Sequence, residues 1–537
     1  MLKVEHLSLY HVKDLTPIVD DLSFTLGGGE RMALIGEEGN GKSTLLRLIA
    51  GDEAVLDYIE TSGRITTDRR PGFLPQELPA AERGLTAYEF FCESPVFFDQ
   101  TPAELGALAA RLALGADVFY SEQRMDSFSG GERVKLQLAR LLMSQPNLLL
   151  LDEPSNDLDA QTVLWLEDFL LTCGLDVLFV SHDEALLTRV ATSVLLIERL
   201  RHRQLPRAAV WKMGYDEFVS RRASSFAHQE QVARKEREEE REKLRRYEQI
   251  RQRVEHEQNA ISRGDPAGAR LLKKKMHTVL AMGRRFEREH EQMTAMPESE
   301  EAIFAKLDCA PLPEGKVVLD LDLPALCVAD GEMGDAAAPD RANGGAASTG
   351  KDREDDGEAG RVLARNLRMS VRGREKVAIV GRNGVGKSTL LRHIAHALKK
   401  RGDLRVFAMP QDPGELLDMD STPVDMLTVS SDGEERARIR TYLGAMQFTT
   451  EEMEHPCAGL SGGQKAKLMF LMMAASGANV LLLDEPTRNL SPLSGPVVRA
   501  LFAEYPGCII AVSHDRLFLR EVCARTLRLT ADGLVEE

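Results

Sequence analysis

Two glycine-rich loops of the same form occur in the sequence, one in each half of the chain. They read GEEGNGKST from Gly36 and GRNGVGKST from Gly381. Each loop follows an apolar run and precedes a helical pattern, which is the strand–loop–helix context of a phosphate-binding loop. Glycines let backbone N–H groups wrap a phosphate, and the N-terminus of the following helix adds positive potential. The two loops therefore predict two sites for the phosphates of ATP or GTP.

The residues of each loop divide into phosphate ligands and a metal ligand. The lysine is expected to reach the β- and γ-phosphates, and the serine after it to help hold Mg²⁺. The predicted nucleotide-binding residues are Gly36, Gly39, Gly41, Lys42, Ser43 and Thr44 in the first loop, and Gly381, Gly384, Gly386, Lys387, Ser388 and Thr389 in the second. An ordinary glycine-rich turn is the alternative, and the repetition of the motif in the same context argues against it.

Two carboxylates close a strongly apolar stretch in each half, in LLLLDEP and VLLLDEP. Four or more apolar residues in a row indicate a central parallel strand that is covered on both faces. Ligands bind at the carboxyl edge of such a sheet. Asp152 and Asp484 are therefore predicted to contact Mg²⁺, and Glu153 and Glu485 to orient and deprotonate the attacking water. The alternative role for these acids is to cap the next helix.

A glutamine and a histidine accompany these motifs in each half. Gln76 and Gln411 each follow a short strand and a proline, and they are predicted to touch the metal ion or the attacking water. His182 and His514 follow apolar runs in VSHD, so they project from strand ends and are predicted to contact the γ-phosphate. A solvated glutamine and a structural histidine are the commoner roles for such residues alone, and their repeated positions favour the functional roles.

The motifs recur with identical spacing. SGGE begins at Ser129 and SGGQ at Ser461. The distance from this serine to the first acid is 23 residues in both halves (152 − 129 and 484 − 461), and from that acid to the histidine it is 30 (182 − 152 and 514 − 484). This agreement indicates an internal duplication of one α/β unit.

Together these motifs resemble those of the ATP-binding cassette (ABC) superfamily, over residues 1–220 and 361–537. The resemblance implies an α/β fold with two P-loop nucleotide-binding domains that face each other head to tail around two ATP molecules. The serine and glycines of one half then complete the site of the other. Lys42 is expected to share a site with Ser461, Gly462 and Gly463, and Lys387 with Ser129, Gly130 and Gly131. The two cassettes of a monomer would then pair within the chain.

The two halves also differ. The loop after the acidic strand ends in Asp159 in the first half, where the second half has Ser491. In the ABC superfamily this aspartate contacts the phosphate loop of the opposite cassette, so its loss predicts unequal sites, with the Lys42 site affected. Tyr10 lies 26 residues before Gly36 (36 − 10), where it is placed either to stack on adenine or to fill the core.

A charged linker separates the halves. Residues 220–260 are rich in Arg, Glu, Lys and Gln and contain no Gly or Pro, which predicts a long helix. A turn at 264–266 and a returning helix over 267–295 would complete a hairpin. The expected domains are residues 1–219, the linker 220–300, and residues 301–537 with a disordered insertion at 331–360.

The tip of this hairpin is strongly basic, although the whole chain has a formal net charge of −16. Residues 261–285 carry a net charge of +6, because seven basic residues face Asp265 alone. A local basic cluster suits RNA phosphates. The predicted RNA-binding residues are Arg263, Arg270, Lys273, Lys274, Lys275, Arg284 and Arg285. The alternative is a solvated spacer, which would need neither a turn nor a charge gradient.

Composition points to a cytoplasmic protein. The seven cysteines are scattered without a CxxC pair, which is typical of a reducing compartment and gives no zinc framework. The sequence shows no signal-peptide pattern and no run of 18 apolar residues. We therefore expect a protein without a membrane span.

Duplicated cassettes joined by a long charged helical linker resemble the ABC-F group within the superfamily. The resemblance implies an ATPase that binds the ribosome and places its linker near peptidyl-tRNA and the peptidyl-transferase centre. Two roles remain open: a translation factor that relieves stalled ribosomes, or a protein that protects ribosomes from antibiotics. The distinctive sequence of the tip slightly favours the second role. An ATPase subunit of a membrane transporter would leave the basic hairpin unexplained. A DNA-maintenance ATPase would need a longer coiled coil and zinc-binding cysteine pairs.

Overall fold

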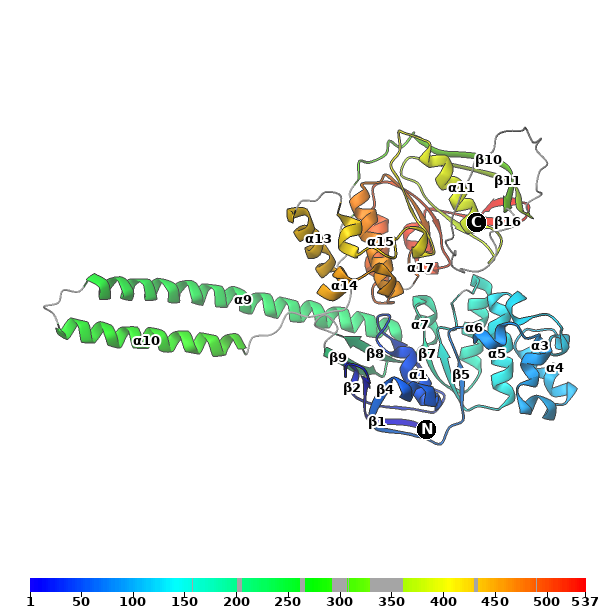
Figure 1. Cartoon of the computed structure of the whole chain (residues 1–537), viewed down its shortest axis with the longest axis horizontal. Helices are drawn as coiled ribbons and strands as arrows, with labels where there is room; N and C mark the ends of the chain where they lie inside the picture. Colours follow the sequence, from blue (N-terminus) through cyan, green and yellow to red (C-terminus); the bar gives the residue numbers. More distant parts are fainter. Residues whose placement is uncertain are drawn as a thin grey trace, which may run out of the picture. The chain divides into compact units, whose positions relative to one another are not determined.

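The computed structural model describes residues 1–156, 158–199, 205–260, 266–291, 307, 309–328, 361–428, 433–488 and 490–537 (Figure 1). The chain forms two compact units, one of Met1–Tyr215 with Glu300–Glu537 and the other of Asp216–Ser299. We refer to the two parts of the first unit as the first and second cassettes. The predicted insertion at 331–360, Arg263 and most of the 264–266 turn lie outside the described residues.

The first cassette is built on a six-stranded sheet with the order β5-β6-β7-β3-β8-β9. Its strands are β5 (Pro71–Leu74), β6 (Leu148–Asp152), β7 (Asp176–Val180), β3 (Arg31–Ile35), β8 (Ser193–Arg199) and β9 (Leu205–Trp211). Neighbouring strands run parallel from β5 to β8, and β9 is antiparallel at the edge. The predicted central position of the acidic strand is confirmed, because all five residues of β6 are buried.

The second cassette repeats this topology with the order β13-β14-β15-β12-β16-β17. Its strands are β13 (Val406–Met409), β14 (Val480–Asp484), β15 (Cys508–Val512), β12 (Lys376–Val380), β16 (Arg525–Thr530) and β17 (Gly533–Glu536). The last strand is again the antiparallel one. Two sheets of the same order confirm the α/β class and the duplication that the motif spacing predicts.

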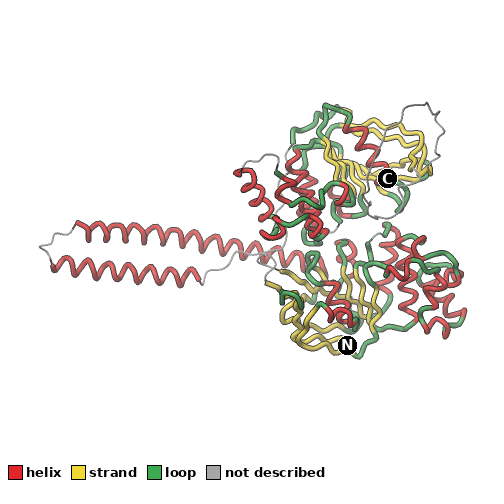
Figure 2. The backbone as a smooth tube through the Cα atoms, in the orientation of Figure 1, coloured by secondary structure: helices red, strands yellow, loops and turns green. Residues whose placement is uncertain are grey.

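Smaller antiparallel sheets and helices complete each cassette (Figure 2). The order β2-β1-β4 joins β1 (Leu2–His11), β2 (Pro17–Leu26) and β4 (Ile59–Thr67), and β10 (Val317–Val328) pairs with β11 (Arg361–Arg372). The helices of the first cassette are α1 (Lys42–Ala50), α2 (Ala80–Arg83), α3 (Ala87–Cys92), α4 (Pro102–Arg111), α5 (Gly130–Met143), α6 (Ala160–Thr172) and α7 (Glu184–Val190). Those of the second are α11 (Lys387–Lys399), α12 (Pro423–Leu427), α13 (Gly433–Ala445), α14 (Thr450–Glu454), α15 (Gly462–Ser476), α16 (Gly495–Glu504) and α17 (Arg516–Val522).

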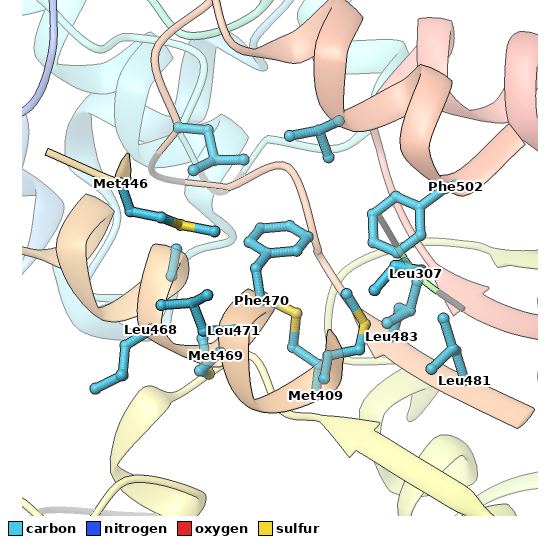
Figure 3. Packing of buried hydrophobic residues seen from close by; sticks show 14 of the residues in the cluster. Leu307, Met409, Met446, Leu468, Met469, Phe470, Leu471, Leu481, Leu483 and Phe502 are labelled. Carbon is cyan, nitrogen blue, oxygen red and sulfur yellow. The ribbon is translucent and has the colours of Figure 1, made fainter. Parts of the chain in front are cut away.

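Apolar side chains from strands and helices fix the position of the second acidic strand (Figure 3). Phe470 on α15 lies in one buried cluster with Leu483 on β14 and Phe502 on α16. Phe470 and Phe502 have ring centroids 5.7 Å apart, and both rings are buried. This packing holds β14 against α15, and it thereby sets where the acids at the end of the strand lie relative to their own helices.

The second unit contains helix α10 (Pro266–Glu291) and all of helix α9 (Tyr215–Ala260) except its first residue. Helix α9 begins at Tyr215, five residues before the expected start, since Asp216 and Glu217 in its first turn favour a helix N-terminus. The two helices pack antiparallel: Lys275 lies 3.6 Å from Glu257, and farther along the pair the rings of Tyr247 and Phe286 are 5.9 Å apart.

Candidate nucleotide-binding sites

Both phosphate loops have a backbone that requires glycine. Gly41 and Gly386 precede α1 and α11 with φ angles of 83° and 102°, in the left-handed region. A Cβ atom on Gly41 would lie 2.2 Å from Ile18, and one on Gly386 would lie 2.7 Å from Leu363. These two apolar residues therefore close one side of each loop. The sequence offered a signal for them, because each lies 18 residues before its loop (36 − 18 and 381 − 363).

The loop lysines are buried and hold the loops in shape. Lys42 Nζ donates to the carbonyl groups of Gly36 and Glu37, each at 2.9 Å. Lys387 Nζ donates to the carbonyls of Gly381 and Arg382 at 2.9 and 3.0 Å. Burial lowers the pKa of both ammonium groups, against the pull of nearby carboxylates. Burial disfavours the charged form of each lysine, and a phosphate bound beside it would favour that form through its negative charge.

The first acid of each pair, Asp152 or Asp484, is buried at the end of its strand. Ser43 Oγ donates to Asp152 Oδ1 at 3.1 Å, and Asp484 Oδ1 is buried without a hydrogen-bond partner among the described residues. Burial raises the pKa of both aspartates. A buried carboxylate oxygen in demand of a cation, beside the loop serine, fits the oxygen-rich ligand set that Mg²⁺ prefers.

The second acid of each pair has an unusual backbone. Glu153 and Glu485 have φ angles of 48° and 50°, in the left-handed region that non-glycine residues seldom adopt. Such a conformation costs about 1–3 kcal/mol, and it clusters at functional sites. The turn redirects each glutamate after its strand, since the amides of Glu153 and Glu485 donate to the carbonyls of Val180 and Val512.

Three side chains engage the carboxylate of Glu153. His182 Nε2 lies 3.1 Å from Oε1, while Asn156 and Gln76 donate to Oε2 at 2.5 and 3.3 Å. Burial raises the pKa of Glu153, but the hydrogen bond and charge of His182 outweigh it and hold the pKa at about 2. Gln76, predicted to contact metal or water, thus contacts the predicted base in this structure.

The equivalent glutamate of the second cassette is held differently. Glu485 Oε2 accepts from the backbone amide of His514 at 3.2 Å, and His514 Nε2 lies 3.8 Å from Oε1. Burial raises the pKa of Glu485 to about 7 and lowers that of His514 to about 4. The position of Asn156 is occupied by Arg488 in this half (488 − 156 equals the repeat offset of 332). The two predicted bases therefore have different electrostatic surroundings.

The predicted signature serines begin helices. Ser129 Oγ accepts a hydrogen bond from the amide of Glu132 at the start of α5, and the Glu132 carboxylate accepts one from the amide of Ser129. Ser461 and Gln464 form the same reciprocal pair at the start of α15. Both are capping boxes, a pattern that SGGE and SGGQ carry in the sequence. Each cap fixes a helix N-terminus whose glycine amides are placed to donate hydrogen bonds to an anion.

At the Lys42 site, helix α15 of the second cassette contacts the phosphate loop of the first cassette. The amide of Gly463 donates to Glu38 Oε2 at 2.5 Å, and Lys467 Nζ lies 2.8 Å from Glu37 Oε2. Glu37 and Lys467 are both buried. The acids occupy positions three and two residues before Asn40, and the second loop has Arg382 and Asn383 instead. Sequence reasoning missed this contact, although two acids within a phosphate-binding loop are a visible anomaly.

At the Lys387 site, the structure contains a cavity of about 850 Å³. This volume falls within the range of small-molecule sites. Its lining combines signature residues of the first cassette with the loop and acids of the second: Gly130, Arg133, Lys387, Ser388, Gln411 and Glu485. The two cassettes thus contribute to the cavity together, as the head-to-tail expectation requires.

The loops after the acidic strands reach across as well. His182 Nδ1 lies 2.6 Å from the carbonyl oxygen of Leu490, in the second cassette. Asp159 caps α6 and lies near Arg382, Lys387 and His514 of the second cassette. Its charge raises the pKa of Lys387 and of His514, against the burial that lowers both. Ser491 is buried and accepts from the amide of Leu493. The aspartate therefore serves the Lys387 site and has no counterpart at the Lys42 site.

Each half of the chain has a phosphate loop, an acidic strand end and a signature helix that lies at the site of the other half. These features define a protein with two ATP-binding cassettes. The ABC transporter family model matches residues 19–156 and 364–488. Energy-dependent translational throttle protein EttA of Mycobacterium tuberculosis is 27% identical, over 96% of this chain and 89% of EttA. ATP-binding cassette sub-family F member 3 of Homo sapiens is 27% identical, over 93% of this chain and 67% of its own. The chain therefore contains two domains of the ATP-binding cassette type, and over more than nine-tenths of its length it is similar to EttA and to an ABC sub-family F protein.

A solved structure shows the same fold. The archaeal ribosome recycling factor aABCE1, crystallised with the ribosomal stalk protein aP1, superimposes with a TM-score of 0.54 at 17% identity. The match covers 99% of this chain and 90% of aABCE1. Among the helices that the structure describes, none is both long and apolar enough to cross a bilayer.

Proposed function

We propose that this chain is a cytoplasmic, Mg²⁺-dependent ATPase that binds the ribosome and acts through its helical linker on tRNA or the peptidyl-transferase region. The observation that carries the ATPase part is the cavity at the Lys387 site, where both cassettes meet around a phosphate loop and a buried glutamate. ATP in such a position favours the closed pair of cassettes, and its hydrolysis releases them.

In this proposal the chain's own residues divide the work of hydrolysis. The loop amides and Lys387 hold the phosphates, and Glu485 accepts the proton of the attacking water while His514 contacts the γ-phosphate. Mg²⁺, held by Ser388, Asp484 and Gln411, supplies charge neutralisation on the phosphates when bound. Lys42, Ser43, Gln76, Asp152, Glu153 and His182 are the equivalent set of the other site.

The linker supports the ribosome part of the proposal through its exposed cations. Arg270, Lys273 and Lys274 are exposed on α10. Lys275 lies 3.6 Å from Glu257, whereas Lys273 and Lys274 form no ion pair with any residue that the structure describes. These two lysines are therefore available to phosphate oxygens, and replacing a phosphate-contacting lysine lowers the salt dependence of binding.

Regulation of translation is the role that the relatives favour, since EttA is named as a translational throttle. The similarity to EttA extends over 96% of this chain, so the linker lies within the aligned region. Protection of ribosomes from antibiotics would use the same basic tip, and the antibiotic sensitivity of a deletion strain distinguishes the two roles.

The test is co-sedimentation of the full chain with ribosomes. The Glu153→Gln/Glu485→Gln variant with ATP is expected to pellet with ribosomes, because it keeps both phosphate loops and loses both predicted bases. Adding Lys273→Glu/Lys274→Glu is expected to weaken binding and to reduce the slope of log affinity against log salt by about 2.

The matched control is Lys399→Glu/Lys400→Glu, which makes the same charge change on two exposed lysines of the second cassette. It should leave binding in place. If the variant with the added lysine changes pelleted at the same level as the control, the role of the tip would be contradicted. If the Glu153→Gln/Glu485→Gln variant did not pellet with ribosomes in the presence of ATP, ribosome binding itself would be contradicted.

A further inference from the structure

Three positions near the contact between the cassettes carry inverted charges in the two halves. Glu167 corresponds to Arg499, Glu184 to Arg516, and Arg189 to Glu521, each at the repeat offset of 332 that relates Asp152 to Asp484. The first cassette thus has the series acid, acid, base, and the second has base, base, acid. We call these six residues the inverted network. They lie on α6 and α7 and on the equivalent helices α16 and α17.

Glu167 joins the two cassettes on one side of the network. Its carboxylate contacts Arg516 of the second cassette and lies 2.6 Å from Arg189 of its own cassette. The Glu167 side chain is fully buried. Arg516 also lies 3.7 Å from Asp183, and Arg189 lies 2.7 Å from Asp168. The buried carboxylate is therefore matched by two guanidinium groups, one from each cassette.

Arg499 makes the same arrangement with the opposite sign. Its guanidinium group lies 2.5 and 3.1 Å from the two oxygens of Glu184 in the first cassette. It also lies 2.7 Å from Glu521 of its own cassette, and its side chain is 5% exposed. The bidentate geometry is the strong form of this pair. The two halves of the network are thus related like the cassettes themselves, with every charge reversed.

We propose that the inverted network makes each cassette select an unlike cassette as its partner. Pairing of a first cassette with another first cassette would bring Glu167 against Glu184. Pairing of two second cassettes would bring Arg499 against Arg516. Either arrangement leaves buried like charges without their partners, which is strongly unfavourable. The surface therefore fits a cassette that carries the reversed series, which is the other half of this chain.

This inference concerns the pairing of cassettes and does not depend on the ribosome or on nucleotide. On this proposal, a duplicated chain whose halves share fold and motifs would pair internally in preference to forming assemblies of like halves. The Glu37–Lys467 pair adds to the selection on the second cassette's side, because Arg382 would face Lys467 if two second cassettes met.

The test reverses the series one cassette at a time in the full chain. Glu167→Arg/Glu184→Arg/Arg189→Glu gives the first cassette the charges of the second and keeps its internal 167–189 pair. Arg499→Glu/Arg516→Glu/Glu521→Arg does the converse. Each variant is expected to lower the equilibrium constant for cassette pairing by at least about 100-fold. In nucleotide-free protein, small-angle X-ray scattering should show a larger radius of gyration.

The variant with all six changes restores every pair in reversed form, and its radius of gyration should return to that of the parent chain. The control Asp425→Arg/Arg436→Asp/Glu454→Arg makes the same net charge change as the variant of the first cassette, at exposed pairs within the second cassette, and it should leave the radius unchanged. The inference would be overturned if either triple variant kept the radius of gyration of the parent chain. It would also be overturned if the variant with all six changes had a radius of gyration as large as those of the triple variants, or were no better folded than they are by circular dichroism.

Discussion

Replacing Glu485 by glutamine is expected to lower steady-state ATP turnover by about 100-fold or more, the usual contribution of a positioned general base. The same change at Glu153 should leave most of the turnover in place. Glu485 lines the cavity at the Lys387 site, and His514 Nε2 lies 3.8 Å from its carboxylate. Glu153 is already engaged by His182, Asn156 and Gln76. A carboxylate committed to three neighbours is less available to accept a proton from water.

Two further differences favour unequal turnover. The Lys42 site has Glu38 of its own loop hydrogen-bonded to Gly463, at a helix terminus suited to the γ-phosphate. Asp159 serves the Lys387 site, while Ser491 stands at the equivalent position for the Lys42 site. Both differences act on the same site. We therefore expect the Lys387 site to carry most of the hydrolysis.

The measurement is phosphate release by each single variant and by the double variant at saturating ATP. Glu454→Gln is the matched control, since it makes the same change at an exposed glutamate that pairs with Arg440. Equal losses in the two single variants would contradict the expectation, and so would a larger loss for Glu153→Gln. A loss in the control would show that the change acts through stability.

Replacing Lys467 by methionine is expected to reduce the stability of the nucleotide-free chain by about 3–5 kcal/mol, the usual cost of leaving a buried charge without its partner. Lys467 and Glu37 form a buried ion pair at 2.8 Å between the cassettes, and Glu37 Oε1 has no hydrogen-bond partner among the described residues. The double variant Glu37→Met/Lys467→Met should be considerably more stable than the single variant, because both charges are then absent.

The repeat supplies a control at the equivalent position of the first cassette. Lys135 corresponds to Lys467 (467 − 332), and its Nζ lies 4.6 Å from the ring of Trp165 in the same cassette. Lys135→Met should have a small effect, because no buried carboxylate loses its partner. Chemical denaturation measures all three variants. A small loss for Lys467→Met, or no recovery in the double variant, would show that the pair adds little to the union of the cassettes.

Taken with the charge inversion at Glu167, Glu184 and Arg189, these contacts describe a duplicated protein whose halves have become complementary. The shared motifs keep two phosphate loops of the same form. Several differences between the halves lie where one half meets the other, among them Glu37, Glu167 and Glu184 of the first cassette. Inequality of the two sites and selectivity of the pairing therefore have a common structural origin.

The sequence by itself determined the α/β class, the duplication and the local geometry of the phosphate loops. These features follow from short-range chemistry: glycines at positive φ, apolar strands such as LLLLD, and serines three residues before Glu132 and Gln464. Helix α9 of the linker was equally predictable, because Gly and Pro are absent from residues 220–260. Arg263 and the insertion at 331–360 lie outside the described residues and remain predictions.

The tertiary structure alone decided which groups meet across the two halves. Glu38 and Gly463 are 425 residues apart in the chain, and Glu167 and Arg516 are 349 apart. No local pattern specifies such a contact, since it depends on how two folded bodies pack. The same reason explains why Gln76 contacts Glu153 and why the two glutamates of identical motifs titrate differently. A motif fixes the residue and its backbone, whereas its charge environment comes from neighbours that only folding brings together.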